Sequence, residues 1–161
     1  MTRRSVPGKG KTMEIERKFL ITADHLPADL AQYPHHEIEQ GYLCTAPVVR
    51  IRRQDEDYIL TYKSKGLMCR EEYNFPLNKA AYFHLKEKAD GILISKTRYV
   101  IPEKDGLKIE LDIFHGKHDG LLLAEVEFPT EEAADSYLPP AWFGEDVTYS
   151  TAYHNSTLSR G

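Results

Sequence analysis

The sequence contains few cysteines and no long hydrophobic run. Cys44 and Cys69 are its only two cysteines, and neither has a nearby histidine in the sequence, which argues against a thiol nucleophile or a zinc site. A chain of this size with so few cysteines does not depend on disulfides. No segment approaches the roughly 20 apolar residues of a transmembrane helix, and no signal-peptide pattern is present. These absences predict a reduced, cytoplasmic protein with no membrane partner.

An excess of positive charge is also absent. The formal net charge is −4 and the isoelectric point is near 6.0, so nothing indicates a nucleic-acid partner, and any polyanion must be met by a local cluster of cations. The length of 161 residues, with 41% hydrophobic and 29% charged, suits one compact domain. We expect residues 1–12, which are basic and rich in Gly, Ser and Pro, to form a disordered leader before a domain over residues 13–161. Met13 is then a candidate initiator.

Short runs of β-branched and aromatic residues, alternating with polar residues at period two, dominate the chain and predict strands. A helix is predicted over Asn78–Asp90, a second over Glu131–Leu138 after Thr130 as N-cap, and a short helical turn near His25–Gln32. Consecutive strands with tight turns indicate an antiparallel meander that closes into a barrel. The predicted strands are Met13–Ile21, Ile38–Cys44, Val48–Gln54, Asp57–Ser64, Met68–Leu77, Ile92–Ile101, Leu107–Phe114 and Leu121–Pro129.

The charged residues repeat on one face of nearly every predicted strand. Glu14, Glu16 and Lys18 share one face of the first strand, while Ile15 and Phe19 take the other. One such pattern alone usually means only a solvated strand face. Seven strands with this pattern, and with apolar opposite faces, indicate that the lumen is the polar side. The predicted fold is therefore α+β: a closed eight-stranded antiparallel β-barrel, or tunnel, with a charged lumen and helices packed outside.

The predicted lumen is balanced in charge. Its basic members are Lys18, Arg50, Arg52, Lys63, Arg70, Lys96 and Arg98. Its acidic members are Glu14, Glu16, Glu72, Glu110, Asp112, Glu125 and Glu127. If the acidic residues bind two divalent cations and the basic residues bind a triphosphate, the lumen stays close to neutral, which matters because burying an uncompensated charge is costly. Carboxylates without Cys or His ligands suit Mg²⁺ or Mn²⁺, and we expect the pair His115 and His118 to lie on the surface.

At this point the residues resemble a known family. The segment Glu14-Ile15-Glu16-Arg17-Lys18 resembles the ExExK signature of the CYTH, or triphosphate tunnel, superfamily. Further matching segments follow in the family's order, almost to the end of the chain. They are Gly41-Tyr42-Leu43, Arg50-Ile51-Arg52, Thr61-Tyr62-Lys63, Arg70-Glu71-Glu72-Tyr73, Lys96-Thr97-Arg98-Tyr99, Glu110-Leu111-Asp112-Ile113-Phe114 and Glu125-Val126-Glu127-Phe128.

The resemblance implies a tunnel open at both ends and, from the short length, the compact bacterial branch that hydrolyses inorganic triphosphate. It implies a first metal on Glu14, Glu16 and Glu127. A second metal or its waters would involve Glu72, Asp112 and Glu125. The cations implied to bind the substrate are Lys18, Arg50, Arg52, Lys63, Arg70 and Arg98. Lys96 is similar to the lysine proposed to activate the attacking water in this branch. To act as a base, it needs a pKa below its ordinary value. Its alternative role is to bind a phosphate group as a cation.

Two departures from the family pattern stand out. Asn74 occupies a place where relatives commonly have Glu, which removes one charge near the implied second metal. Ser150 and Ala152 stand where Asp and Arg are usual, in a C-terminal stretch that is a candidate plug helix over one tunnel mouth.

The leading interpretation is an inorganic triphosphatase that acts on a small molecule. A class IV adenylate cyclase and a thiamine triphosphatase stay open as alternatives, but they need an additional pocket for adenosine or thiamine. Trp142 and Phe143 could stack on such a ring, although after two prolines they are more simply anchors in the core. A polyphosphate or nucleotide sensor without turnover is a different class of function. The sequence leaves open whether the chain forms a homodimer.

Overall fold

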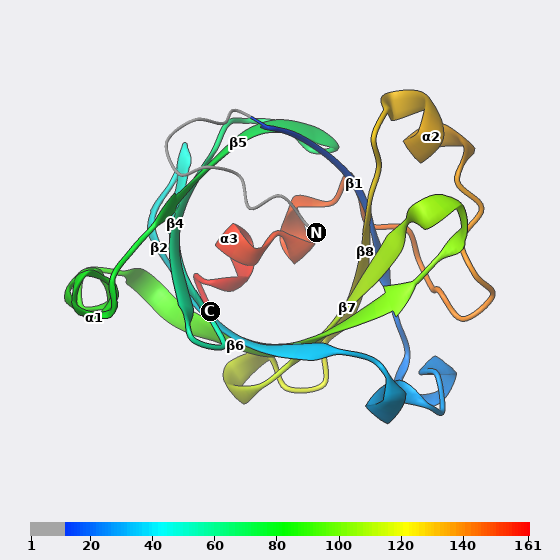
Figure 1. The fold of residues 1–161 in the computed structure, drawn as a ribbon, viewed down its shortest axis with the longest axis horizontal. Helices are drawn as coiled ribbons and strands as arrows, with labels where there is room; N and C mark the ends of the chain where they lie inside the picture. Colours follow the sequence, from blue (N-terminus) through cyan, green and yellow to red (C-terminus); the bar gives the residue numbers. More distant parts are fainter. Residues whose placement is uncertain (1–11) are drawn as a thin grey trace.

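The structure, a computed structural model, describes residues 12–161, and the predicted leader lies outside them except for its last residue. Eight antiparallel strands form a closed barrel (Figure 1), which confirms the predicted α+β barrel. The strands are β1 (Thr12–Leu20), β2 (His35–Thr45), β3 (Val48–Gln54), β4 (Asp57–Lys63), β5 (Cys69–Pro76), β6 (Asp90–Pro102), β7 (Lys108–Phe114) and β8 (Leu122–Glu127).

The order of the strands differs from the predicted meander. Around the barrel they run β1-β5-β4-β3-β2-β6-β7-β8, so two meanders, β2 to β5 and β6 to β8, meet where β2 pairs with β6. The first strand closes the ring: Thr12–Ile15 pair with β5, and Glu16–Leu20 pair with β8. The alternation of apolar and polar residues would be the same in the predicted and the observed strand order, because it shows only which face of a strand each side chain occupies. The order depends on contacts between distant segments.

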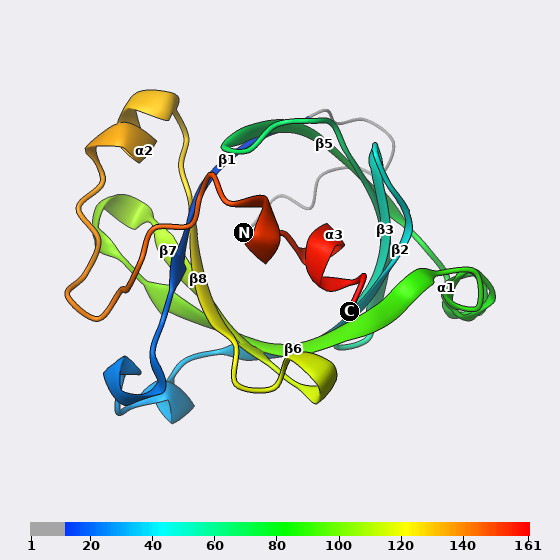
Figure 2. The ribbon, with the colours of Figure 1, turned by 180° about the vertical axis from the view of Figure 1, so that it is seen from behind.

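Two of the three helices lie outside the barrel, as predicted, whereas the last one lies within the ring of strands (Figures 1 and 2). Helix α1 (Lys79–Lys86) starts where predicted, since the Asn78 side chain accepts a hydrogen bond from the Ala81 backbone N–H at 2.7 Å. It ends earlier than predicted because β6 already begins at Asp90. The predicted turn near His25–Gln32 is two 3₁₀ turns. The remaining elements are the 3₁₀ turns Ala23–His25, Leu30–Gln32, Lys104–Gly106, Gly116–His118 and Thr151–Tyr153, and helices α2 (Glu131–Ser136) and α3 (Asn155–Leu158).

Helix α2 and the chain after it cover the outer face of β1, β8 and β7. The helix is capped by Thr130 and ends at Ser136, two residues before the predicted end at Leu138. The Arg17 guanidinium donates hydrogen bonds to the carbonyl oxygens of Ala134 and Tyr137 at this end, at 3.0 and 2.9 Å. The main hydrophobic core lies beneath it and includes Phe19, whose ring centroid is 4.8 Å from that of Phe143. Phe143 and the neighbouring Trp142 are therefore core anchors. Within residues 12–161, no helix combines the length and apolar character that a membrane crossing requires.

The C-terminal segment lies inside the ring of strands (Figures 1 and 2), where it fills one end of the tunnel barrel, as expected of the candidate plug. Tyr153 and Leu158 pack there against inward-facing apolar side chains of the barrel. Those side chains are Tyr42, Val48, Ile94, Phe114 and Leu123, together with Val147 of the C-terminal segment. One end of the lumen is thus filled by a second, smaller apolar cluster.

Backbone contacts hold this segment in place. The Val147 N–H donates to the Lys18 carbonyl at 2.8 Å, and the Ile92 N–H donates to the Ser159 carbonyl at 2.6 Å. Gly91, at φ +67°, leaves no room for a side chain, since a Cβ there would lie 2.1 Å from the Ser159 oxygen. His118 is not a plain surface residue as predicted: it is half-buried, and its Nε2 lies 2.7 Å from the Leu158 carbonyl oxygen.

Candidate active site

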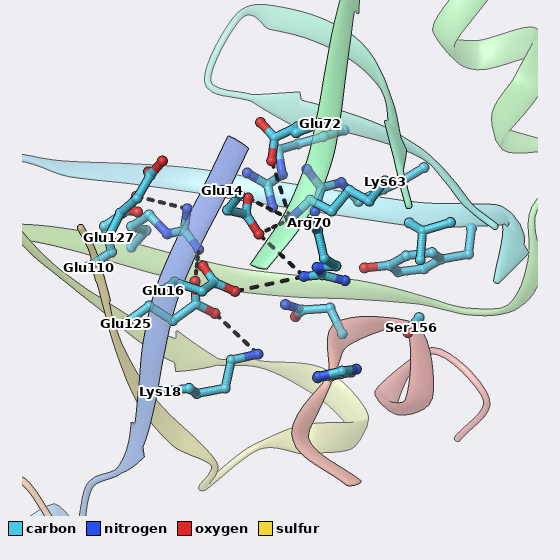
Figure 3. Close-up of a pocket in the computed structure, with 17 residues that line it drawn as sticks. Glu14, Glu16, Lys18, Lys63, Arg70, Glu72, Glu110, Glu125, Glu127 and Ser156 are labelled. Carbon is cyan, nitrogen blue, oxygen red and sulfur yellow. Dashed lines mark hydrogen bonds and ion pairs between the residues drawn. The ribbon is translucent and has the colours of Figure 1, made fainter. Parts of the chain in front are cut away.

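The other part of the lumen is a charged cavity of about 150 Å³ (Figure 3). Its lining includes Glu127, which is exposed to solvent, Glu110, which is partly exposed, and residues of the C-terminal segment. Its lining residues are Glu14, Glu16, Lys18, Tyr42, Val48, Arg50, Arg52, Lys63, Arg70, Glu72, Arg98, Glu110, Glu125, Glu127, His154, Asn155 and Ser156. The structure therefore gathers all the predicted site residues except Lys96 and Asp112.

Strand pairing explains why the carboxylates crowd together. Glu16 of β1 lies opposite Glu127 of β8, and Lys18 lies opposite Glu125. Burial raises the pKa of Glu16 to about 8, and repulsion from Glu125 and Glu14 adds to the shift. Burial also raises the pKa of Glu127 to about 7, with repulsion from neighbouring glutamates. For Glu16, burial and repulsion outweigh the cations nearby, which include Arg70 Nη2 at 3.7 Å from Glu16 Oε1.

Other carboxylates of the lining are paired with cations. Lys63 Nζ lies 2.9 Å from Glu14 Oε2, and Arg70 Nη2 lies 3.3 Å from Glu14 Oε1 (Figure 3). Burial alone would raise the pKa of Glu14, but these two cations lower it. Lys18 Nζ lies 3.5 Å from Glu125 Oε1, and Glu125 with Glu16 raises the pKa of Lys18 against the effect of burial. Among residues 12–161, no three side chains of His, Cys, Asp or Glu converge in an arrangement that could hold a metal ion.

Lys96 and Asp112 form a sealed ion pair behind the cavity. Both side chains are 0% exposed, and Lys96 Nζ lies 2.7 Å from Asp112 Oδ2. Arg98 donates to both oxygens of Asp112, at 2.7 and 2.9 Å, and to Glu110 at 2.9 Å. Burial lowers the pKa of Lys96 to about 7, helped by Arg98 against the pull of Asp112. Lys96 also donates to Asn155 Oδ1 at 3.3 Å, so the C-terminal segment covers it.

Arg50 and Arg52 differ from the other cations of the lining. Neither has a carboxylate partner in the part of the chain that the structure describes. Arg50 Nη2 donates to the Thr61 hydroxyl at 3.4 Å, and Arg52 donates two hydrogen bonds to Gln40 Oε1 at 2.9 and 2.7 Å. Burial lowers the pKa of Arg52 to about 9, with Arg50 and Arg98 as nearby like charges.

Asn74 connects Thr61, which contacts Arg50, with Glu72 of the cavity lining. Its Oδ1 accepts a hydrogen bond from the Thr61 hydroxyl at 2.6 Å, and its Nδ2 donates to Glu72 Oε1 at 2.6 Å. The departure from the family pattern therefore places a neutral amide between a carboxylate and the residue that holds Arg50.

Several residues at the cavity were not predicted. Gln40 faces inward by strand alternation, two residues before Tyr42, but it is uncharged and so was not selected from the charge pattern. His154 belongs to the C-terminal segment, where no local periodicity marks a site. Burial lowers the pKa of His154 to about 4, together with Lys18 and Arg70, so its ring is neutral at neutral pH.

Comparisons with known proteins agree with this arrangement. The sequence model of the CYTH domain matches residues 12–157. An inorganic triphosphatase of Nitrosomonas europaea is 40% identical over 149 residues, which cover 91% of this chain and 96% of that protein. An inorganic triphosphatase of Acetivibrio thermocellus is 34% identical over 150 residues, covering 90% and 92%. A crystal structure of the inorganic triphosphatase NE1496 matches with a TM-score of 0.68 and 36% identity, over 92% of this chain and 95% of that one.

Proposed function

The chain belongs to the CYTH domain family, and we propose that it hydrolyses inorganic triphosphate to pyrophosphate and phosphate inside its barrel, with the help of a divalent metal ion. The observation that carries the proposal is the cavity, whose lining holds six cations and six carboxylates in a space of about 150 Å³. Both relatives named as inorganic triphosphatases match more than nine-tenths of their own length.

The cations supply the grip on the substrate. Phosphoryl transfer requires the protein mainly to hold the phosphate chain in line and to neutralise its oxygens, and guanidinium groups do this bidentately. We assign the phosphate contacts to the cationic residues that line the cavity. These are Lys18, Arg50, Arg52, Lys63, Arg70 and Arg98.

The chemistry of the acidic side fits a hard divalent cation. Burial and repulsion from neighbouring glutamates raise the pKa values of Glu16 and Glu127, and a bound cation would offset this repulsion. The groups that would hold it are carboxylate oxygens, as Mg²⁺ and Mn²⁺ prefer. Glu14, Glu16 and Glu127 would hold a first metal, and Glu72 and Glu125 a second metal or its waters. These carboxylates would have to move closer together on binding, because among residues 12–161 they are not already grouped as a metal site. Asp112 is bound by Arg98 and Lys96 instead. When bound, such an ion offsets the negative charge of the phosphate oxygens.

Lys96 is our candidate for the group that accepts the proton of the attacking water. With a pKa near 7, a large fraction of its amine is uncharged at neutral pH. Lys96 Nζ is held by Asp112 and covered by Asn155, so Asn155 has to move before water can reach it. The alternative role, a phosphate clamp, predicts an effect on KM instead of kcat.

The substrate choice follows from what the cavity lacks. Among its lining residues, only Tyr42, Val48 and the ring of His154 offer an apolar or aromatic surface. An adenine or thiamine ring needs a larger apolar wall, so we favour inorganic triphosphate over ATP or thiamine triphosphate. A small-molecule substrate and a cytoplasmic location complete the proposal.

The test measures phosphate release from inorganic triphosphate, ATP and thiamine triphosphate, with Mg²⁺ and with Mn²⁺. We expect inorganic triphosphate to give the highest kcat/KM, with no release when the metal is chelated. Faster cleavage of ATP at saturating metal would overturn the substrate choice, and formation of cyclic AMP would identify a cyclase. Calorimetric binding of inorganic triphosphate without any phosphate release would indicate a sensor.

A further inference from the structure

The cations around the cavity fall into two groups according to their protein partners. Lys18, Lys63 and Arg70 each lie within 4 Å of a glutamate, and Arg98 is bound by Asp112 and Glu110. Arg50 and Arg52, described above, are held by a hydroxyl and an amide. In the described part of the chain no carboxylate forms an ion pair with either of them, although Asp112 attracts Arg52 from a longer distance.

Gln40 holds Arg52 in a defined orientation. The two residues lie opposite each other on β2 and β3, and both hydrogen bonds from the guanidinium end on the same amide oxygen, at 2.9 and 2.7 Å. A guanidinium has only donors, so the oxygen of the amide must face it and the NH₂ group must point elsewhere. The Gln40 side chain is 0% exposed, and its Nε2 has no hydrogen-bond partner among the described residues.

Local physical chemistry would favour a glutamate at this position. A glutamate has the same shape, would give Arg52 stronger, charge-assisted hydrogen bonds and would leave no unpaired N–H donor. It would also compensate a buried positive charge that has other arginines as neighbours. An amide at this position is therefore costly for the fold alone. Its benefit is that the charge of Arg52 stays available to an anion.

We propose that Gln40 is a positioning residue for the substrate, whose neutral amide orients the Arg52 guanidinium toward the phosphate chain without cancelling its charge. Gln40 is not among the residues that line the cavity, so it acts through Arg52 and does not touch the substrate. This inference rests on the proposed function for the identity of the anion, inorganic triphosphate. The orienting role itself requires only that a polyanion binds in the cavity.

The decisive variant is Gln40→Glu, which changes charge but not size. We expect the Kd for inorganic triphosphate, measured by titration calorimetry, to rise about ten- to hundredfold, as when one charged contact is lost. KM should rise by a similar factor with kcat changed less than about threefold, and the melting temperature should be equal to or above that of the wild type. Unchanged binding by Gln40→Glu would overturn the proposal.

Two further variants separate positioning from other effects. Gln40→Met removes the hydrogen bonds but adds no charge, so it should raise the Kd less than Gln40→Glu does. Gln32→Glu adds the same charge on an exposed 3₁₀ turn outside the cavity, and it should bind triphosphate like the wild type. Equal losses of binding and of melting temperature in both Gln40 variants would show that Gln40 has only a structural role, and would also overturn the proposal.

The binding measurement keeps this inference distinct from the proposed function. If the wild type binds inorganic triphosphate without hydrolysing it, and Gln40→Glu weakens that binding, the role of Gln40 stands and the proposed activity fails. If hydrolysis is observed and Gln40→Glu leaves KM and Kd unchanged, the activity stands and the role of Gln40 fails.

Discussion

The two ends of the barrel interior are built by the same strands but serve different purposes. On β8, Glu125 and Glu127 face the cavity, while Leu123 on the same face lies in the apolar cluster beneath the C-terminal segment. On β7, Asp112 is followed two residues later by Phe114 in that cluster. Alternation decides which side chains face inward, and their position along the axis decides whether they meet a ligand or another part of the chain. The charged end should therefore determine activity, and the apolar end stability.

The largest effect is expected from Glu16→Gln at the charged end. The change removes a carboxylate oxygen that we assign to the metal, so metal-dependent kcat should fall by about a hundredfold or more. Glutamine resembles the protonated glutamate that a pKa of about 8 favours, so thermal unfolding should show no loss of stability. The control is Glu87→Gln on the exposed end of α1, which should behave like the wild type. Wild-type turnover by Glu16→Gln in Mg²⁺ would refute the metal assignment.

Lys96→Met tests the boundary between the two ends. Lys96 Nζ lies 5.2 Å from the centre of the Phe114 ring, with the charged Asp112 beside it. If Lys96 accepts the proton of water, wild-type kcat should rise as pH increases through about 7, because the amine loses its proton there. The variant should lose this rise and about a hundredfold in kcat. A raised KM with the pH profile intact would instead assign Lys96 as a phosphate clamp.

Leu123→Ala tests the apolar end. Leu123 is fully buried beside the C-terminal segment, and removing its side chain should lower the free energy of unfolding by about 2–5 kcal/mol. Denaturant titration measures this loss. The KM of the folded protein should stay within about threefold of the wild type, since Leu123 does not line the cavity. A large rise in KM under conditions where the Leu123→Ala variant is fully folded would show that packing at the apolar end affects substrate binding at the charged end.

The smallest effect is expected from Asn74→Glu, which adds a carboxylate beside Glu72. The amide now donates a hydrogen bond to Glu72, and a glutamate would instead repel it unless a cation lies between them. The Mg²⁺ concentration for half-maximal activity should fall about two- to fivefold, and the melting temperature should become more dependent on Mg²⁺. Asn74→Gln keeps a neutral amide and should not lower the requirement. An unchanged requirement in Asn74→Glu would separate Asn74 from metal binding.

Most of the cavity was predictable because its residues follow a local rule. Arg50 and Arg52 are two positions apart on one strand, so their shared face follows from strand geometry alone. The same rule correctly placed Lys96 and Asp112 on the inward face of their strands. It could not show that they are separated from the cavity, because that depends on their ion pair and on the contact of Lys96 with Asn155, which is distant in the sequence. The position of β1 between β5 and β8, and the entry of the C-terminal segment, likewise depend on contacts between distant segments that periodicity does not report.

Within residues 12–161 the C-terminal segment fills one end of the lumen, so we expect substrate to enter the cavity on the side of the solvent-exposed Glu127. Substrate and both products would then pass this side, one after another. Pyrophosphate and phosphate should behave as competitive inhibitors, since either product in place blocks entry.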